Sequence, residues 1–184
     1  MKSKISMNGS GCAGGLRLAV MTIVGALLLM LAGCSMTGGS NVQLTDIPVN
    51  KGAALAKINA YRASHGLPRL ALDPELDVAA NDMARLIARK DSMNTRAHSA
   101  RGLSGRLDRA GYATYAGAEN LGAGYVSFDH ALSGWKGSPD HDKNLLNKYV
   151  TRIGLARVQR PDGRYLNFWV LILARPVADG RPAV

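Results

Sequence analysis

The chain has 184 residues, with 23 Lys and Arg against 13 Asp and Glu and a formal net charge of +10. Its two cysteines are Cys12 and Cys34, so residues 35–184 can form neither a disulfide nor a cysteine nucleophile. No run of five or six like charges occurs, which is typical of charges scattered over a solvated surface.

Residues 1–33 have the pattern of an export signal. Three basic residues precede the almost wholly apolar stretch 18–32, which is shorter than the roughly 20 residues that a membrane-spanning helix needs. The stretch leads into Leu-Ala-Gly-Cys, which ends at Cys34 and is similar to the bacterial lipobox. This predicts cleavage before Cys34 and acylation of that cysteine, for example with palmitate. The alternative is a signal-anchor helix whose cysteine is incidental.

Cleavage before Cys34 would remove three of the 23 basic residues and leave 20 against 13 acidic ones, a net charge of +7. A basic exported domain favours anionic neighbours such as lipid head groups or envelope polymers. Nucleic acid is not an expected partner, because export separates the protein from it. Ser35, and no acidic residue, follows Cys34. We therefore expect a membrane-anchored lipoprotein, on the outer membrane facing the periplasm if the cell is Gram-negative.

The chain after the signal divides into a tether, one domain and a tail. Residues 34–50 are small and polar and have no helical period, which predicts a flexible tether. The domain is expected over residues 51–177, and residues 178–184 form the C-terminal tail. No internal repeat is present.

Apolar residues recur at helical spacing through the first two thirds of the domain. Helices are predicted over residues 51–65, 74–90, 104–110 and 128–135, and from Pro139 onward. The helix over 74–90 is the best defined, because Asp73 can cap it and Pro74 suits its first position. Residues 91–102 are expected to form a loop. The glycine-rich stretch 111–125 predicts neither a secure helix nor a regular strand.

The last third of the domain changes to the pattern of β-strands. Strands are predicted over residues 153–158 and 165–174, and the turn residues 161–163 join them as an antiparallel hairpin. Residues 168–173 are apolar at every position, which indicates burial on both faces of the sheet. We therefore expect an α+β fold, an α-β-α sandwich with a central antiparallel sheet.

Three residues are candidates for chemistry. Glu119 lies among small residues that would bury it, and a buried carboxylate needs a partner or must be neutral. His98 lies in a predicted loop. His141 is the third residue of the helix that follows its predicted N-cap, Ser138, where the helix dipole favours a neutral imidazole able to bind a metal or accept a proton. A structural role is the alternative for each histidine.

Several motifs, in the same order, resemble bacterial members of the CAP superfamily, which contains cysteine-rich secretory proteins, antigen 5 and pathogenesis-related proteins. The motifs lie within residues 52–176 and are INAYRASHGLPRLALDPEL, AANDMA, AHS, AENLGAG, an intervening tryptophan, SPDH with NLL, RIGLA and YLNFWVLILARP. The resemblance implies an α-β-α sandwich with a cleft lined by His98, Glu119 and His141. In eukaryotic members the two histidines can hold a divalent ion such as zinc. The second glutamate of that cluster has no equivalent here, although Asp129 or Asp140 could replace it.

Two functions follow from these residues and the resemblance. The first is an exported, lipid-anchored binding module of the bacterial envelope, whose cleft takes a lipid, a wall fragment or a metal. The alternative is a metal-dependent hydrolase of a cell-envelope substrate, with Glu119 as base and His98 and His141 as zinc ligands or an acid–base pair. Glu119 could be a third ligand or could only orient one imidazole. A serine hydrolase is not expected, since no GxSxG motif occurs.

Overall fold

The computed structural model describes residues 42–182 of the chain. The predicted export signal, residues 1–33, and the predicted lipidation site, Cys34, lie outside the described residues. Within residues 42–182, none of the helices combines the length and the apolar character needed to span a bilayer.

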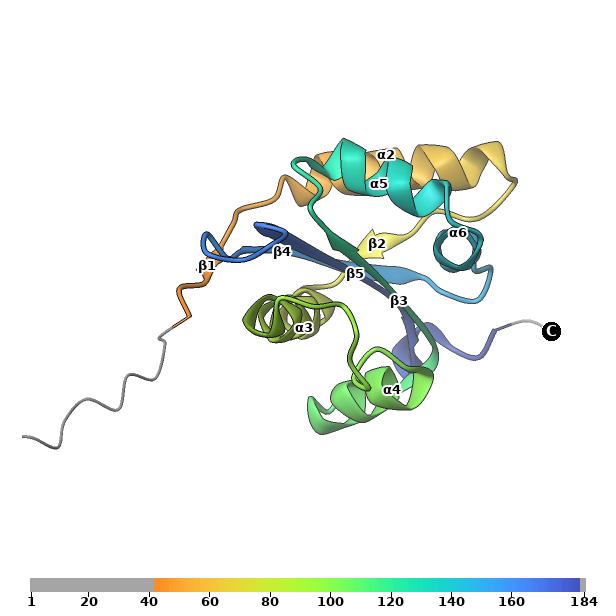
Figure 1. Cartoon of the computed structure of the whole chain (residues 1–184). Coiled ribbons are helices and arrows are strands. Elements are labelled where there is room, and N and C mark those ends of the chain that lie inside the picture. The colour runs from red at the N-terminus through yellow and green to blue at the C-terminus, as the bar shows by residue number, and fades with distance from the viewer. Residues whose placement is uncertain (1–41, 183–184) are drawn as a thin grey trace, which may run out of the picture. The chain divides into compact units, whose positions relative to one another are not determined.

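A five-stranded sheet forms the middle layer of the domain (Figure 1). The strands follow the order β1 (Thr45–Asp46), β4 (Arg152–Gln159), β5 (Asn167–Pro176) and β3 (Thr114–Ala123), and β2 (Ala71–Leu72) also pairs with β4. The pairs along this order are antiparallel, whereas β2 runs parallel to β4. β3 is therefore an edge strand, and the cleft described below lies beside it.

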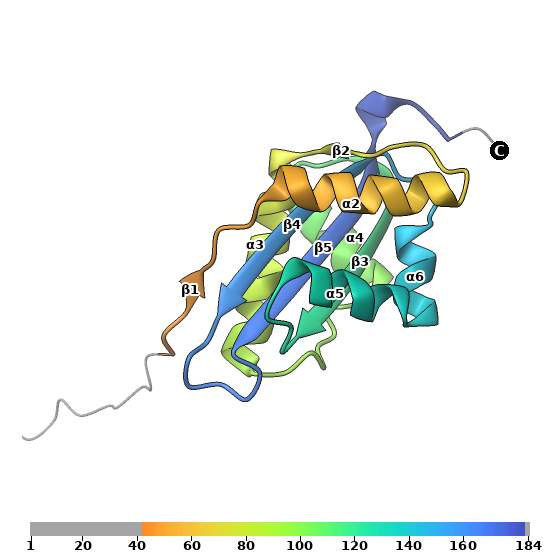
Figure 2. The same cartoon turned by 90° about the horizontal axis from the view of Figure 1, so that it is seen from above.

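Helices cover both faces of this sheet (Figures 1 and 2). One face carries α2 (Lys51–Ser64), α5 (Phe128–Lys136) and α6 (Pro139–Leu145). The other face carries α3 (Pro74–Lys90) and α4 (Ala100–Arg109). A short 3-10 helix, η1 (Val177–Asp179), follows β5. The predicted α-β-α sandwich is confirmed.

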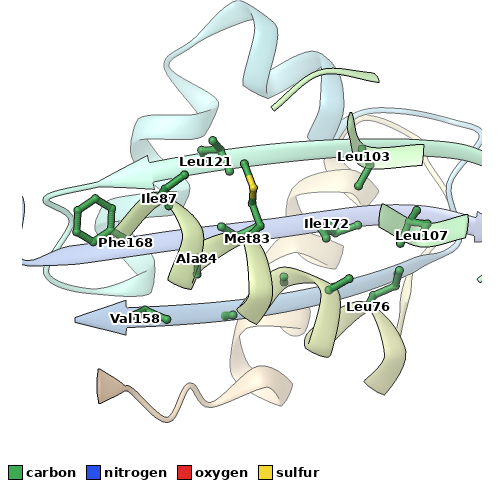
Figure 3. Close-up of a cluster of buried hydrophobic side chains, with 14 of the residues drawn as sticks. Leu76, Met83, Ala84, Ile87, Leu103, Leu107, Leu121, Val158, Phe168 and Ile172 are labelled. Atoms are coloured by element: carbon green, nitrogen blue, oxygen red, sulfur yellow. The ribbon is translucent and has the colours of Figure 1, made fainter. Parts of the chain in front are cut away.

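Strand β5 supplies both cores, as its continuous apolar sequence predicts. Phe168, Val170 and Ile172 pack with α3 and α4, on the side drawn in Figure 3. The alternating residues Trp169, Leu171 and Leu173 pack with the helices on the opposite face. All six side chains are at most 2 % exposed, and full burial of a large apolar side chain contributes about 1.5–3 kcal/mol. The central strand therefore holds the two helical layers together.

Helix starts with clear capping residues lie where the sequence predicts them. The Asp73 carboxylate accepts a hydrogen bond of 3.0 Å from the Glu75 amide, and Pro74 is the first residue of α3. Helix α6 begins at Pro139 and makes His141 its third residue. Ser138 precedes it as expected, but its side chain makes no capping hydrogen bond.

Helix α4 begins four residues earlier than the predicted range 104–110. Ser99 is its N-cap and accepts a hydrogen bond of 3.0 Å from the Gly102 amide. Glycine disfavours a helix locally, which hid this first turn from the sequence pattern. Here Gly102 allows close packing, because a Cβ at this position would overlap the Ala97 carbonyl group.

The prediction that residues 111–125 form no regular strand is wrong. Residues 114–123 form β3, which pairs with β5 along almost its whole length. Small side chains are required there by the tertiary packing, since a Cβ on Gly122 would lie 2.9 Å from the Tyr125 ring. The predicted hairpin of the last two strands is confirmed, with ends one or two residues away from the observed β4 and β5.

The ordered domain extends beyond the predicted boundaries at both ends. In the predicted tether, β1 pairs with β4, and the Ile47 amide donates to the Arg157 carbonyl at 2.9 Å. In the predicted tail, Asp179 accepts two hydrogen bonds from Arg152, which help to lower the pKa of Asp179 to about 2. The tether and tail predictions are therefore wrong for these residues.

Candidate functional site

A cavity of about 390 Å³ lies beside β3, between the start of α4 and helix α6. His98 precedes α4, Glu119 lies in β3, and His141 lies in α6, and all three line the cavity. The other lining residues are small or polar apart from one leucine: Ser99, Ala100, Leu103, Gly117, Ala118, Ser138, Asp140 and Asn144. The structure thus brings the three predicted residues together, and their role stays a prediction.

The side chains of β3 alternate between the two helical layers. Successive side chains of a strand point to opposite faces of the sheet. Leu121 belongs to the core under α3 and α4, and Ala118 belongs to the opposite core. Glu119 therefore points toward α4, and its neighbour Asn120 points toward α6.

The Glu119 carboxylate is buried, and each of its oxygens has one protein partner. Its side chain is 3 % exposed. One carboxylate oxygen, Oε2, lies 3.0 Å from His98 Nδ1, and the other, Oε1, accepts from the guanidinium of Arg106. Because a carboxylate only accepts hydrogen bonds, Nδ1 is the protonated nitrogen of His98. In the neutral imidazole, Nε2 is then left as an acceptor.

Sequence reasoning missed Arg106, which holds the His98 side of the cleft. Its guanidinium also donates to the carbonyl of Ala97, the residue before His98. One signal was present in the sequence, because Arg106 follows the inward-facing Leu103 by three residues and precedes the inward-facing Leu107. An arginine at this spacing lies beside the buried stripe of its helix.

Asparagines hold the α6 side of the cleft. Asn144 on α6 donates to the Asn120 side-chain oxygen at 2.9 Å and to the Glu119 carbonyl at 3.3 Å. Asn120 is fully buried and donates to the His141 carbonyl at 3.0 Å. These bonds fix the helix that carries His141 against the edge strand. Asn120 thus satisfies backbone groups, as an asparagine in such a position commonly does.

Burial is the main reason that the pKa of His141 is lowered. The proximity of His98 lowers it further, and Asp140 opposes the shift. The sequence predicted a neutral His141 from the helix dipole. The direction agrees, but the largest cause is loss of solvation, because a buried imidazolium is less well hydrated than one in water.

His141 is expected to be neutral at pH 7, and protein stability is expected to fall as the pH falls below the unfolded-state value of 6.5. A lowered pKa means that the unfolded chain binds more protons than the native protein in this range. Melting temperatures at about pH 7 and pH 5 should therefore differ less in His141→Asn than in the parent. His65→Asn, at the exposed end of α2, is the control, and an equal reduction in both variants would contradict the expectation.

The two aspartates that could replace the missing family glutamate lie in different places. Asp140 lines the cavity beside His141. Asp129 is absent from the cavity lining and forms an exposed ion pair with Lys57 on α2. Only Asp140 is therefore placed to act in the cleft.

The contacts of Glu119 do not fit a metal site built from His98, Glu119 and His141. Each carboxylate oxygen already accepts from a protein group, and the side chain is only 3 % exposed, so a metal ion has little access to it. Within residues 42–182, no three His, Cys, Asp or Glu side chains are grouped so that they could hold a metal ion. Coordination by Glu119 would require displacement of Arg106 or His98.

Solved structures of bacterial proteins have the same fold. An outer surface protein from Borrelia burgdorferi matches with a TM-score of 0.63 and 19% identity, covering 73% of this chain and 99% of that chain. An extracellular protein containing a SCP domain from Bacillus anthracis matches with a TM-score of 0.55 and 24% identity, covering 71% and 45%. A cysteine-rich secretory protein from Staphylococcus aureus matches with a TM-score of 0.50 and 21% identity, covering 70% and 41%. At these identities the likeness shows the fold alone, and this chain spans less than half of the last two proteins.

Comparison with curated proteins finds no significant match. The family model described as "CAP: Cysteine-rich secretory protein family" matches residues 55–173. This range contains β2, β3 and β4, helices α3 to α6, and all three predicted cleft residues. The chain belongs to the cysteine-rich secretory protein (CAP) family.

Proposed function

We propose that this protein is an exported, lipid-anchored binding module of the bacterial cell envelope, and that its ligand occupies the cleft lined by His98, Glu119 and His141. The extracellular and outer-surface proteins that share its fold support a place in the envelope. The lipobox-like sequence that ends at Cys34 supports the anchor.

The burial of Glu119 and its two protein partners carry the choice of a binding module over a hydrolase. A general base needs a free acceptor within reach of the substrate. Both oxygens of Glu119 are held by protein groups, so this carboxylate fixes His98 and is not itself presented to a ligand. The role of Glu119 is then to position the imidazole of His98.

The chemistry of the remaining lining suits a ligand with polar and apolar parts. His98 Nε2 and the neutral His141 ring are available for hydrogen bonds, and the Ser138 hydroxyl has no capping role. Leu103 and Ala118 supply apolar surface to the same cavity. Such a mixture is typical of pockets in which a few polar groups orient a ligand.

Filling the cleft is expected to reduce binding to isolated envelope material by at least about tenfold, or about 1.4 kcal/mol. Ala100 lines the cavity and is exposed, so Ala100→Trp places an indole at the ligand position without entering the core. Ala63→Trp, at an exposed position of α2 outside that cavity, is the matched control. Binding of the full chain to peptidoglycan sacculi and to anionic phospholipid vesicles is measured by sedimentation, with palmitate labelling to test acylation at Cys34.

Equal binding by the parent and Ala100→Trp would contradict the cleft as the binding site. Release of soluble fragments from sacculi by the parent, lost in Glu119→Gln and His98→Gln, would instead favour the hydrolase. Labelling that persists in Cys34→Ser would contradict the proposed anchor.

A further inference from the structure

We infer that Arg106 is the resident cation of this cleft, which neutralises Glu119 in place of a metal ion and positions His98. The inference concerns the cleft of the proposed function but does not depend on which ligand occupies it. It rests on two contacts of a single guanidinium, with Glu119 and with the Ala97 carbonyl, and on the burial of the ion pair that it forms.

The Arg106–Glu119 ion pair lies away from solvent. The Arg106 side chain is 13 % exposed and the Glu119 side chain is 3 % exposed. Screening by water and salt is weak at such a site, so a buried carboxylate requires a nearby cation or strong hydrogen bonds. Among residues 42–182, Arg106 is the only Lys or Arg that forms an ion pair with Glu119.

Arg106 also connects the carboxylate to the loop that carries His98. One terminal nitrogen donates to Glu119, and the other donates to the Ala97 carbonyl. Ala97 precedes His98, whose Nδ1 lies 3.0 Å from the second oxygen of Glu119. Arg106, Glu119 and His98 thus form a closed unit, in which the guanidinium fixes both the loop and the carboxylate that orient the imidazole.

A divalent ion at this site would compete directly with the guanidinium. Binding to Glu119 would place the ion beside Arg106, where two positive charges repel each other in a poorly solvated environment. Removal of the guanidinium would relieve this repulsion and free one carboxylate oxygen. His98, Glu119 and His141 are not grouped as metal ligands in the parent, so the three side chains would also have to move together. They would then provide two imidazoles and one carboxylate, which is a common ligand set for zinc.

Cobalt(II), a spectroscopic substitute for zinc, tests the inference on the detergent-solubilised full chain. Arg106→Met is expected to bind cobalt one-to-one at least about tenfold more tightly than the parent, a change of the size that groups beside metal ligands produce. The gain should disappear in Arg106→Met/His141→Gln. Arg106→Lys keeps the positive charge and is expected to exclude cobalt as the parent does.

The parent itself can be tested even if no Arg106 variant folds. Tight one-to-one binding of cobalt by the parent that is lost in Glu119→Gln and in His141→Gln would overturn the inference. Equal cobalt affinity in the parent and a folded Arg106→Met would overturn it as well. A second measurement addresses positioning, because nitrogen NMR of the parent should find a proton on His98 Nδ1, the nitrogen that faces Glu119. The opposite tautomer would contradict the closed unit. Failure of either metal or NMR test leaves the envelope-binding experiment unaffected.

Discussion

Gly154→Ala is expected to destabilise the domain by about 3 kcal/mol or more, at the upper end of the cost of overpacking. A Cβ on Gly154 would lie closer than 3.0 Å to backbone atoms of Leu76 and Asp77, in the first turn of α3. Backbone atoms cannot move aside as the end of a flexible side chain can. The strand and the helix would have to separate.

Hydrogen bonds on both sides of Gly154 oppose that separation. The Asp73 amide donates to the Ile153 carbonyl at 2.9 Å, and the Leu155 amide donates to an Asp77 carboxylate oxygen at 2.9 Å. The added methyl group therefore either strains the contact or breaks these bonds, and both outcomes lower the free energy of unfolding.

Urea denaturation of the parent and the variant measures the effect. Gly52→Ala is the matched control, because a Cβ on Gly52 in α2 would meet only the Asn50 side chain, at 3.7 Å. Alanine favours the helix, so this control should change stability by less than about 1 kcal/mol. A midpoint for Gly154→Ala close to that of Gly52→Ala would show that α3 and β4 can separate freely.

Arg62→Met is the second substitution for which we expect a large loss, about 3 kcal/mol. Arg62 is fully buried on α2 and donates to the carbonyls of Pro68, Leu145 and Asn147 at 3.0, 2.7 and 2.9 Å. Burial lowers its pKa. Methionine would fill much of the volume but leave three carbonyls without this donor, and each unsatisfied buried group costs about 1–3 kcal/mol.

Arg62→Met is expected to destabilise the cleft as well. Arg62 bonds to Leu145, which is the last residue of α6, the helix that carries His141. Hydrogen exchange of the α6 amides should therefore increase in Arg62→Met more than exchange of the α3 amides. Arg69→Met is the control for loss of charge, because Arg69 is exposed and lies in the connection between α2 and β2. If the stability of Arg62→Met lies within about 1 kcal/mol of the parent, water replaces the Arg62 guanidinium at these carbonyls.

Local sequence signals were sufficient for the elements whose stability is local. Asp73 and Pro74 define the start of α3, because capping depends on residues within one turn. The two-sided apolar pattern of β5 required helices on both faces of the sheet, since an exposed apolar face would be unfavourable in water. His98, Glu119 and His141 were found from their types, their surroundings and the family resemblance.

The edge strand and the chemistry of the cleft were decided by the tertiary structure. The small residues of β3 have weak strand propensity, and pairing with β5 and close packing at Gly122 make them a strand. The sequence places Arg106 beside the buried stripe of α4, but only the approach of α4 to β3 places its charge on Glu119. The sequence by itself determined the layers, because periodicity and capping act over a few residues. It indicated the three candidate residues through their types and the family resemblance. Which cation neutralises the carboxylate depended on tertiary structure, because that contact joins groups 13 residues apart on different elements.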